Sequence, residues 1–90
     1  MNKQTQEVLD ILQEECAEVI QAISKVRRFG IDEIHLKNGH SNRTHLTEEI
    51  GDLLAMVDLL QLFNIVTAEG LSDAKHAKIE KLKKWSKIYE

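Results

Sequence analysis

Apolar residues recur three and four positions apart along three stretches of the chain, which is the spacing of one face of an α-helix. The first stretch predicts a helix over residues 4–28, closed by Gly30 in a left-handed conformation. A polar segment follows, in which a short helical turn is expected around residues 31–36. The chain therefore begins with a long amphipathic helix and a polar loop.

The second and third stretches predict two more helices. One is expected over residues 43–68, with Asn42 as its N-cap and Gly70 as its terminator. The other is expected over residues 73–88, with Ser72 as its N-cap. No proline interrupts these elements. The pattern predicts an all-α fold, an antiparallel bundle of three main helices with a short fourth helix as an option.

The second predicted helix is apolar nearly all round. Besides the face that carries Leu53 and Val57, its other side carries Ala55, Leu59, Leu62 and Val66. A helix that is apolar on both sides has to be buried on both sides, which three helices alone do not easily achieve. We therefore expect a single domain over residues 1–90, with the bundle completed by oligomerisation to a homodimer or a homotetramer.

Composition narrows the class of protein further. The net charge of −3 gives no basic footprint for nucleic-acid binding. No apolar run approaches the roughly 18 residues that span a bilayer, and the N-terminus lacks the apolar centre of a signal peptide. The lone Cys16 cannot form an internal disulfide, which fits a reducing compartment. We expect a cytoplasmic protein with neither a nucleic-acid nor a membrane partner.

Two of the predicted helices carry acids on their apolar faces. On a helical wheel, Glu15 falls inside the apolar arc of the first helix and Glu18 lies at its edge. The second helix repeats this arrangement with Glu49 inside its arc and Asp52 at the edge. The two helices thus share one pattern, an acid within the apolar face and another acid one turn later on its margin.

The ordinary explanation of a glutamate beside an apolar stripe is a flanking residue whose charged head reaches water. Four such acids in two matched pairs would repel one another strongly if the helices packed together. They could avoid this repulsion by taking up protons or by coordinating cations. Ligand sets made of oxygen alone suit hard divalent ions, chiefly Mg²⁺ or Mn²⁺. The matched pairs therefore favour a metal site.

The acids also carry a family resemblance. The stretches "EECAE" (residues 14–18) and "EEIGD" (residues 48–52) resemble the EExxE…ExxD signature of the all-α nucleoside triphosphate pyrophosphohydrolases. Within that superfamily the chain is most similar to the small MazG-like proteins, some of them phage-encoded. The thirty residues between Glu18 and Glu49 make the intervening loop slightly longer than usual for the group.

The resemblance implies an activity and a set of residues. The activity is metal-dependent hydrolysis of a nucleoside or deoxynucleoside triphosphate between the α and β phosphates, which gives a monophosphate and pyrophosphate. The implied cofactor is Mg²⁺, with Mn²⁺ as a substitute. The metal ligands are Glu15, Glu18, Glu49 and Asp52, and Glu14 or Glu15 is the candidate to orient or deprotonate the attacking water.

Basic residues are expected to bind the phosphates. Lys25 lies two turns beyond Glu18 at nearly the same wheel position, and Arg28 follows one turn later. The resemblance adds Lys78 and Lys81 of the last predicted helix. The alternative for all four is a solvated cation, at a helix end for Lys25 and Arg28 and on an exposed face for the other two.

Other interpretations remain open. The related phosphoribosyl-ATP pyrophosphatase shares the reaction logic. A dimeric helical interaction module, in which the acids form salt bridges between chains, would need no metal. A di-iron bundle would need Glu-x-x-His motifs, which the long helices lack. His35, His40 and His45 recur every five residues but have no cysteine partner, so they are expected to be surface histidines rather than zinc ligands.

Overall fold

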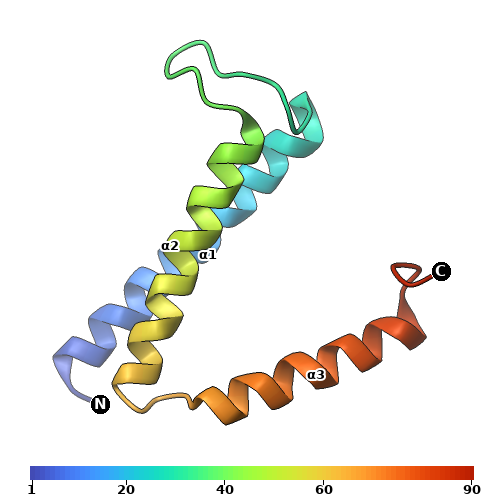
Figure 1. Cartoon of the computed structure of the whole chain (residues 1–90). Helices are drawn as coiled ribbons and strands as arrows, with labels where there is room; N and C mark the ends of the chain where they lie inside the picture. Colours follow the sequence, from blue (N-terminus) through green and yellow to red (C-terminus); the bar gives the residue numbers. More distant parts are fainter. The chain divides into compact units, whose positions relative to one another are not determined.

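The protein is all-α, as predicted. A computed structural model describes residues 1–90, with helices α1 (Lys3–Phe29), α2 (Asn42–Leu62) and α3 (Ala68–Trp85) (Figure 1). The chain forms two compact units, Met1–Leu60 and Gln61–Glu90. None of the three helices is long and apolar enough to cross a membrane.

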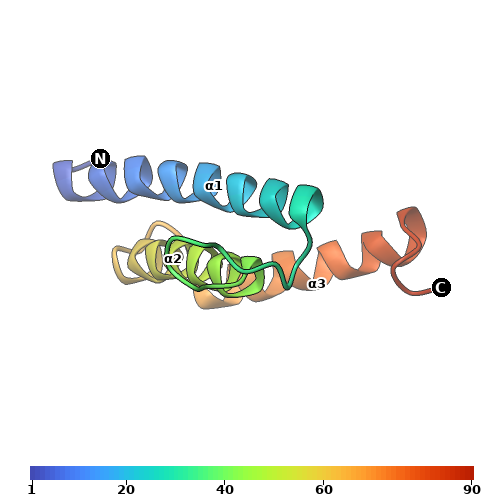
Figure 2. The ribbon, with the colours of Figure 1, turned by 90° about the horizontal axis from the view of Figure 1, so that it is seen from above.

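In the first unit, α2 runs back along α1 after the loop, so the two helices form an antiparallel hairpin (Figures 1 and 2). One seam of each helix is buried or half-buried, and its members alternate three and four positions apart, as in a coiled coil. The seam of α1 consists of Thr5, Val8, Leu12, Glu15, Val19, Ala22 and Val26. The corresponding seam of α2 begins at Asn42 and continues through Leu46, Glu49, Leu53, Met56 and Leu60.

The seam of α1 lies within the face that the apolar pattern predicts, but it is narrower than that face. The apolar spacing of α1 includes Cys16, Ala22 and Ile23 alike, but Cys16 and Ile23 are exposed and Ala22 is almost completely buried. A small residue such as alanine allows two helices to approach closely. Because the seam passes through Ala22, it also passes through Glu15, seven residues earlier.

The ends of α1 follow the predicted chemistry. The Asn2 side chain accepts a hydrogen bond of 2.8 Å from the Thr5 backbone N–H and caps the first turn. At the other end, Gly30 adopts φ +100° and donates its N–H to the Val26 carbonyl at 2.9 Å. The positive φ suits glycine and confirms Gly30 as the residue that ends the helix.

The loop between α1 and α2 differs from the prediction. Residues 31–36 form no helix, because their backbone pairs with the start of α2 instead. Ile34 and Ser41 form an isolated antiparallel bridge, and the Asn42 N–H donates to the Glu33 carbonyl at 3.0 Å. The loop is therefore held as a short hairpin-like excursion rather than as a helical turn.

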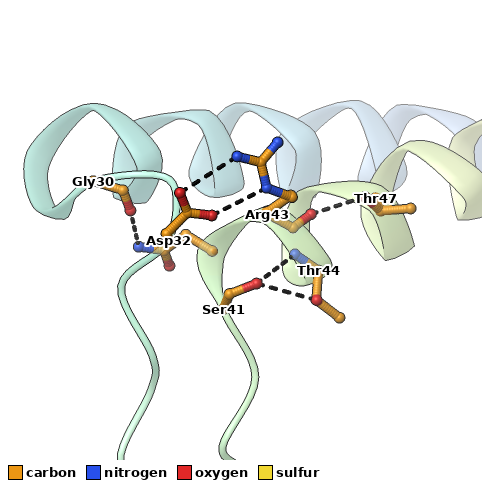
Figure 3. A network of polar contacts seen from close by, with 7 residues as sticks. Gly30, Asp32, Ser41, Arg43, Thr44 and Thr47 are labelled. Carbon is orange, nitrogen blue, oxygen red and sulfur yellow. Dashed lines mark hydrogen bonds and ion pairs between the residues drawn. The ribbon is translucent and has the colours of Figure 1, made fainter.

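The start of α2 also corrects the sequence analysis. Ser41, rather than Asn42, caps the helix, since its hydroxyl accepts from the Thr44 N–H at 3.1 Å (Figure 3). Asn42 is the first helical residue and only 2% exposed. Its amide donates to the Gly30 carbonyl at 2.8 Å, and its side-chain oxygen bonds to His35. Asn42 therefore ties the two ends of the loop together.

The boundary between the second and third helices was predicted wrongly. Helix α2 ends at Leu62 rather than at residue 68, and Asn64 adopts φ +61°, a conformation that asparagine tolerates. Thr67 is the N-cap of α3 and accepts from the Gly70 N–H at 2.9 Å. Gly70 therefore lies in the first turn of α3 and does not end α2. Ser72 lies inside α3, so it is not a cap.

Candidate metal site in the helical hairpin

Three of the four predicted metal ligands lie together in the first unit. Glu15 of α1 and Glu49 and Asp52 of α2 each offer a carboxylate oxygen, and these oxygens lie within 4.8 Å of one another. Glu15 and Glu49 belong to the packed seam and are half-buried, whereas Asp52 is exposed at its margin. We call these three residues the acidic cluster. The coiled-coil spacing of the hairpin brings them together from two helices.

The remaining acids of the two motifs lie outside this group. Glu18, predicted as a ligand, is exposed and does not join the other three, although its charge acts on Glu15. Glu14 is also exposed. Glu48 points to the loop, where its carboxylate lies 3.8 Å from Nδ1 of His40.

The electrostatics of Glu15 reflect this crowding. Burial raises the pKa of the Glu15 carboxyl, and the negative charges of Asp52 and Glu49 raise it further. Clustered carboxylates of this kind resist ionisation unless a cation offsets their charge. The donor set, composed of oxygen alone, fits a hard divalent cation such as Mg²⁺. The site therefore has the chemistry that a metal centre requires.

We expect the metal-free protein to lose stability as the pH rises through the raised pKa of Glu15. The folded protein holds this proton more tightly than the unfolded chain, where the pKa is the ordinary 4.5. The resulting stabilisation is fully present below pH 4.5 and disappears above the folded pKa. Urea unfolding in EDTA between pH 4 and 7 should therefore show a steeper decline for the wild type than for Glu15→Gln. Identical pH dependences would contradict this account of Glu15.

His45, expected from the sequence to be a surface histidine, is half-buried and contacts the acidic cluster. His45 Nε2 lies 3.1 Å from Oε1 of Glu49, and the Glu49 side chain is only 15% exposed. The His35 ring packs edge-on against His45 with ring centroids 6.0 Å apart, and His35 in turn bonds to Asn42. Groups that hydrogen-bond to metal-ligating side chains fix their orientation. The i, i+4 spacing of His45 and Glu49 was the available signal.

The four predicted phosphate-binding cations are placed differently from one another. Lys25 is half-buried and lines two pockets beside the loop. Arg28 is exposed, with its guanidinium carbon 4.8 Å from the centre of the Phe29 ring. Lys78 and Lys81 are exposed on α3, which belongs to the second unit. Of the four, Lys25 is the one that lines these pockets.

The fold and the site define a class, an all-α protein whose helical hairpin carries an acidic cluster suited to a metal. The sequence profile of the MazG nucleotide pyrophosphohydrolase domain matches residues 3–87. The chain belongs to the MazG nucleotide pyrophosphohydrolase family. No curated protein and no solved structure matches the chain.

Proposed function

We propose that the protein is a Mg²⁺-dependent pyrophosphohydrolase that cleaves nucleoside or deoxynucleoside triphosphates between the α and β phosphates. The products are a nucleoside monophosphate and pyrophosphate. The observation that carries this proposal is the convergence of Glu15, Glu49 and Asp52 across the helical seam, in a chain of the MazG family. The matched region extends over nearly all of residues 1–90, which we take as one functional domain.

The acidic cluster would hold the metal, with Glu18 completing the ligand set from the adjacent turn of α1. Divalent ions bound there would offset charge on the phosphates and lower the pKa of a water. Glu14 or Glu15 would orient that water or accept its proton. His45 holds the Glu49 carboxylate in place through the 3.1 Å contact. Mn²⁺, which shares the preference for oxygen ligands, would substitute for Mg²⁺.

Lys25 would provide a fixed positive charge for the substrate. A triphosphate is polyanionic, so the acidic cluster alone would repel it. Lys25 lines a pocket together with His45 and Glu48, and Glu48 is the neighbour of Glu49 in the sequence. Lys25 forms no ion pair within the protein. Its ammonium group is therefore available to a phosphate. Arg28, Lys78 and Lys81 are the further candidates for this role.

A substrate panel tests the proposed activity. Pyrophosphate release is measured for ribonucleoside and deoxyribonucleoside triphosphates, for modified nucleotides and for phosphoribosyl-ATP, each with Mg²⁺, Mn²⁺ or EDTA. We expect turnover of at least one nucleotide with either metal and none in EDTA. Absence of turnover for every nucleotide under every metal would contradict the proposed function and favour an interaction module.

We also propose that the chain works as a homodimer or a homotetramer. Large apolar side chains remain exposed on both helices of the first unit, among them Ile20 at 67% and Leu54 at 52%. A second copy of the chain would bury such residues and offset their exposure to water. Light scattering at micromolar concentration should report a dimer or a larger assembly, and Ile20→Lys should shift it toward the monomer. A wild-type monomer would contradict this expectation.

A further inference from the structure

A pocket lies where the end of α1 meets the loop that leads into α2. It has a volume of about 240 Å³. Phe29 and Ile34 supply its large apolar surfaces, and both are about half exposed. Its polar groups come from Lys25, Glu33, His35 and Asn42. We call this the loop pocket. Apolar walls with a few convergent polar groups are typical of small-molecule sites.

A second, smaller pocket shares wall residues with the loop pocket, and one of its other wall residues contacts the acidic cluster. It is about 100 Å³ in volume and is lined by Lys25, Asn38, Glu48 and three histidines, which are His35, His40 and His45. The two pockets share Lys25 and His35 as wall residues. At the other end, His45 contacts Glu49 of the acidic cluster at 3.1 Å. A ligand bound at the cluster could therefore continue past the histidines into the loop pocket.

The chemistry along this path changes in the same order as the parts of a nucleotide. The acidic cluster suits metal-bound phosphates. The histidine-lined pocket offers hydrogen-bond donors and acceptors for a sugar, and its Lys25 offers a positive charge for the neighbouring phosphate. The loop pocket adds an aromatic ring and a branched aliphatic side chain, which suit the faces of a flat heterocycle. Its volume lies below the roughly 300–1000 Å³ of pockets for drug-sized ligands, so it cannot enclose a whole triphosphate.

We propose that the loop pocket receives the heterocyclic base of the nucleotide whose phosphates lie at the acidic cluster. This proposal rests on the proposed function for the identity of the ligand. It assigns base contact to Phe29 and Ile34, and it makes the slightly long loop between the two acidic motifs a determinant of substrate choice. Glu33 and His35 present hydrogen-bonding groups to the edge of the base.

The wall of the loop pocket is held in shape before any ligand binds. The His35 N–H donates to the His40 carbonyl and the Gly39 N–H donates to the His35 carbonyl, both at 2.9 Å. The Arg43 N–H donates to the Ile31 carbonyl at 2.8 Å, and its guanidinium pairs with Asp32 at 3.1 Å (Figure 3). Because these contacts already order the loop, less conformational entropy is lost when a ligand binds to the loop pocket.

The first test is kinetic and uses the full-length chain with its preferred triphosphate and Mg²⁺. Phe29→Ala and Ile34→Ala should each raise KM, roughly 5- to 150-fold for the aromatic residue, with little change in kcat. Leu36→Ala is the matched control, because Leu36 is fully exposed in the same loop and lines neither pocket. Wild-type KM in both pocket variants, at normal kcat, would overturn the loop pocket and leave the proposed activity intact.

The second test does not depend on turnover. Nitrogen-15-labelled protein in EDTA is titrated with the four ribonucleoside and four deoxyribonucleoside monophosphates. At least one of them should shift the NMR signals of the backbone amides of Phe29, Ile34 and His35. Phe29→Ala should raise the dissociation constant obtained from these shifts at least 5-fold. If no monophosphate at millimolar concentration shifted these amides, or if Phe29→Ala responded like the wild type, the proposal would be overturned. Shifts of these amides in a protein without turnover would support the pocket and count against the pyrophosphohydrolase.

Discussion

Replacing Glu49 with glutamine should lower turnover at least about 100-fold while leaving the metal-free protein as stable as the wild type. The amide keeps the shape of the carboxylate, but it is a much weaker ligand for a divalent ion. Metal-assisted charge stabilisation contributes several kcal/mol to such reactions, so loss of a ligand is expected to be severe. Stability should hold because one of three mutually repelling charges disappears and the amide oxygen can still lie against the His45 ring nitrogen.

Glu48→Gln is the matched control for this experiment. Glu48 precedes Glu49 in the same helix, but its side chain is exposed and lies outside the acidic cluster. We expect Glu48→Gln to retain most of kcat and to act at most on KM, because Glu48 lines the smaller pocket, whereas Asp52→Asn should resemble Glu49→Gln. The measurement combines initial rates with melting temperatures in EDTA and in excess Mg²⁺. Wild-type activity in Glu49→Gln, or a large loss of its metal-free stability, would contradict the assignment of Glu49 as a ligand.

Asn42→Ala should produce the largest loss of stability among the substitutions considered. The Asn42 side chain is 2% exposed and bonds both to the Gly30 carbonyl and to His35. Alanine leaves a small cavity and removes both bonds, which is expected to cost about 1–3 kcal/mol in the free energy of unfolding. The loop should loosen as well, because Gly30 and Asn42 stand at its two ends.

Asn38→Ala provides the comparison for Asn42. Asn38 lies in the same loop and accepts a hydrogen bond of 2.9 Å from the His40 N–H, but it is exposed to water. Its loss should change the free energy of unfolding by less than about 0.5 kcal/mol. Urea unfolding of both variants at neutral pH measures the difference. Equal stabilities for the two variants would show that the buried network around Asn42 does not hold the loop.

The apolar periodicity predicted the three helices and the end of α1 at Gly30, since both follow from local chemistry. The limits of the packed seam were harder to predict, because a helical wheel counts every apolar residue alike. Cys16 and Ile23 widened the predicted face of α1 beyond the seam, which holds Ala22 as predicted and also the polar Thr5. Which side of a helix packs depends on the partner helix as well as on its own sequence.

The acidic cluster was predicted only in part. The repeated motif identified Glu15, Glu49 and Asp52, which the hairpin brings together. Glu18 shares the motif but is exposed at the margin of the seam, so its place in the ligand set is still a prediction. The contact between His45 and Glu49 requires a particular pair of rotamers, which periodicity does not specify. Asn42 was predicted as a cap. Its buried role could not be predicted, because that role depends on the path of the loop.

The central claim is that the acidic cluster supports hydrolysis between the α and β phosphates of a nucleotide. Phosphorus-31 NMR of a complete reaction tests this most directly, with the best substrate of the panel, Mg²⁺ and the full-length protein. We predict that the signals of the triphosphate are replaced by those of a nucleoside monophosphate and pyrophosphate, and that Glu49→Gln leaves the triphosphate intact. Signals of orthophosphate and a nucleoside diphosphate would contradict the claim.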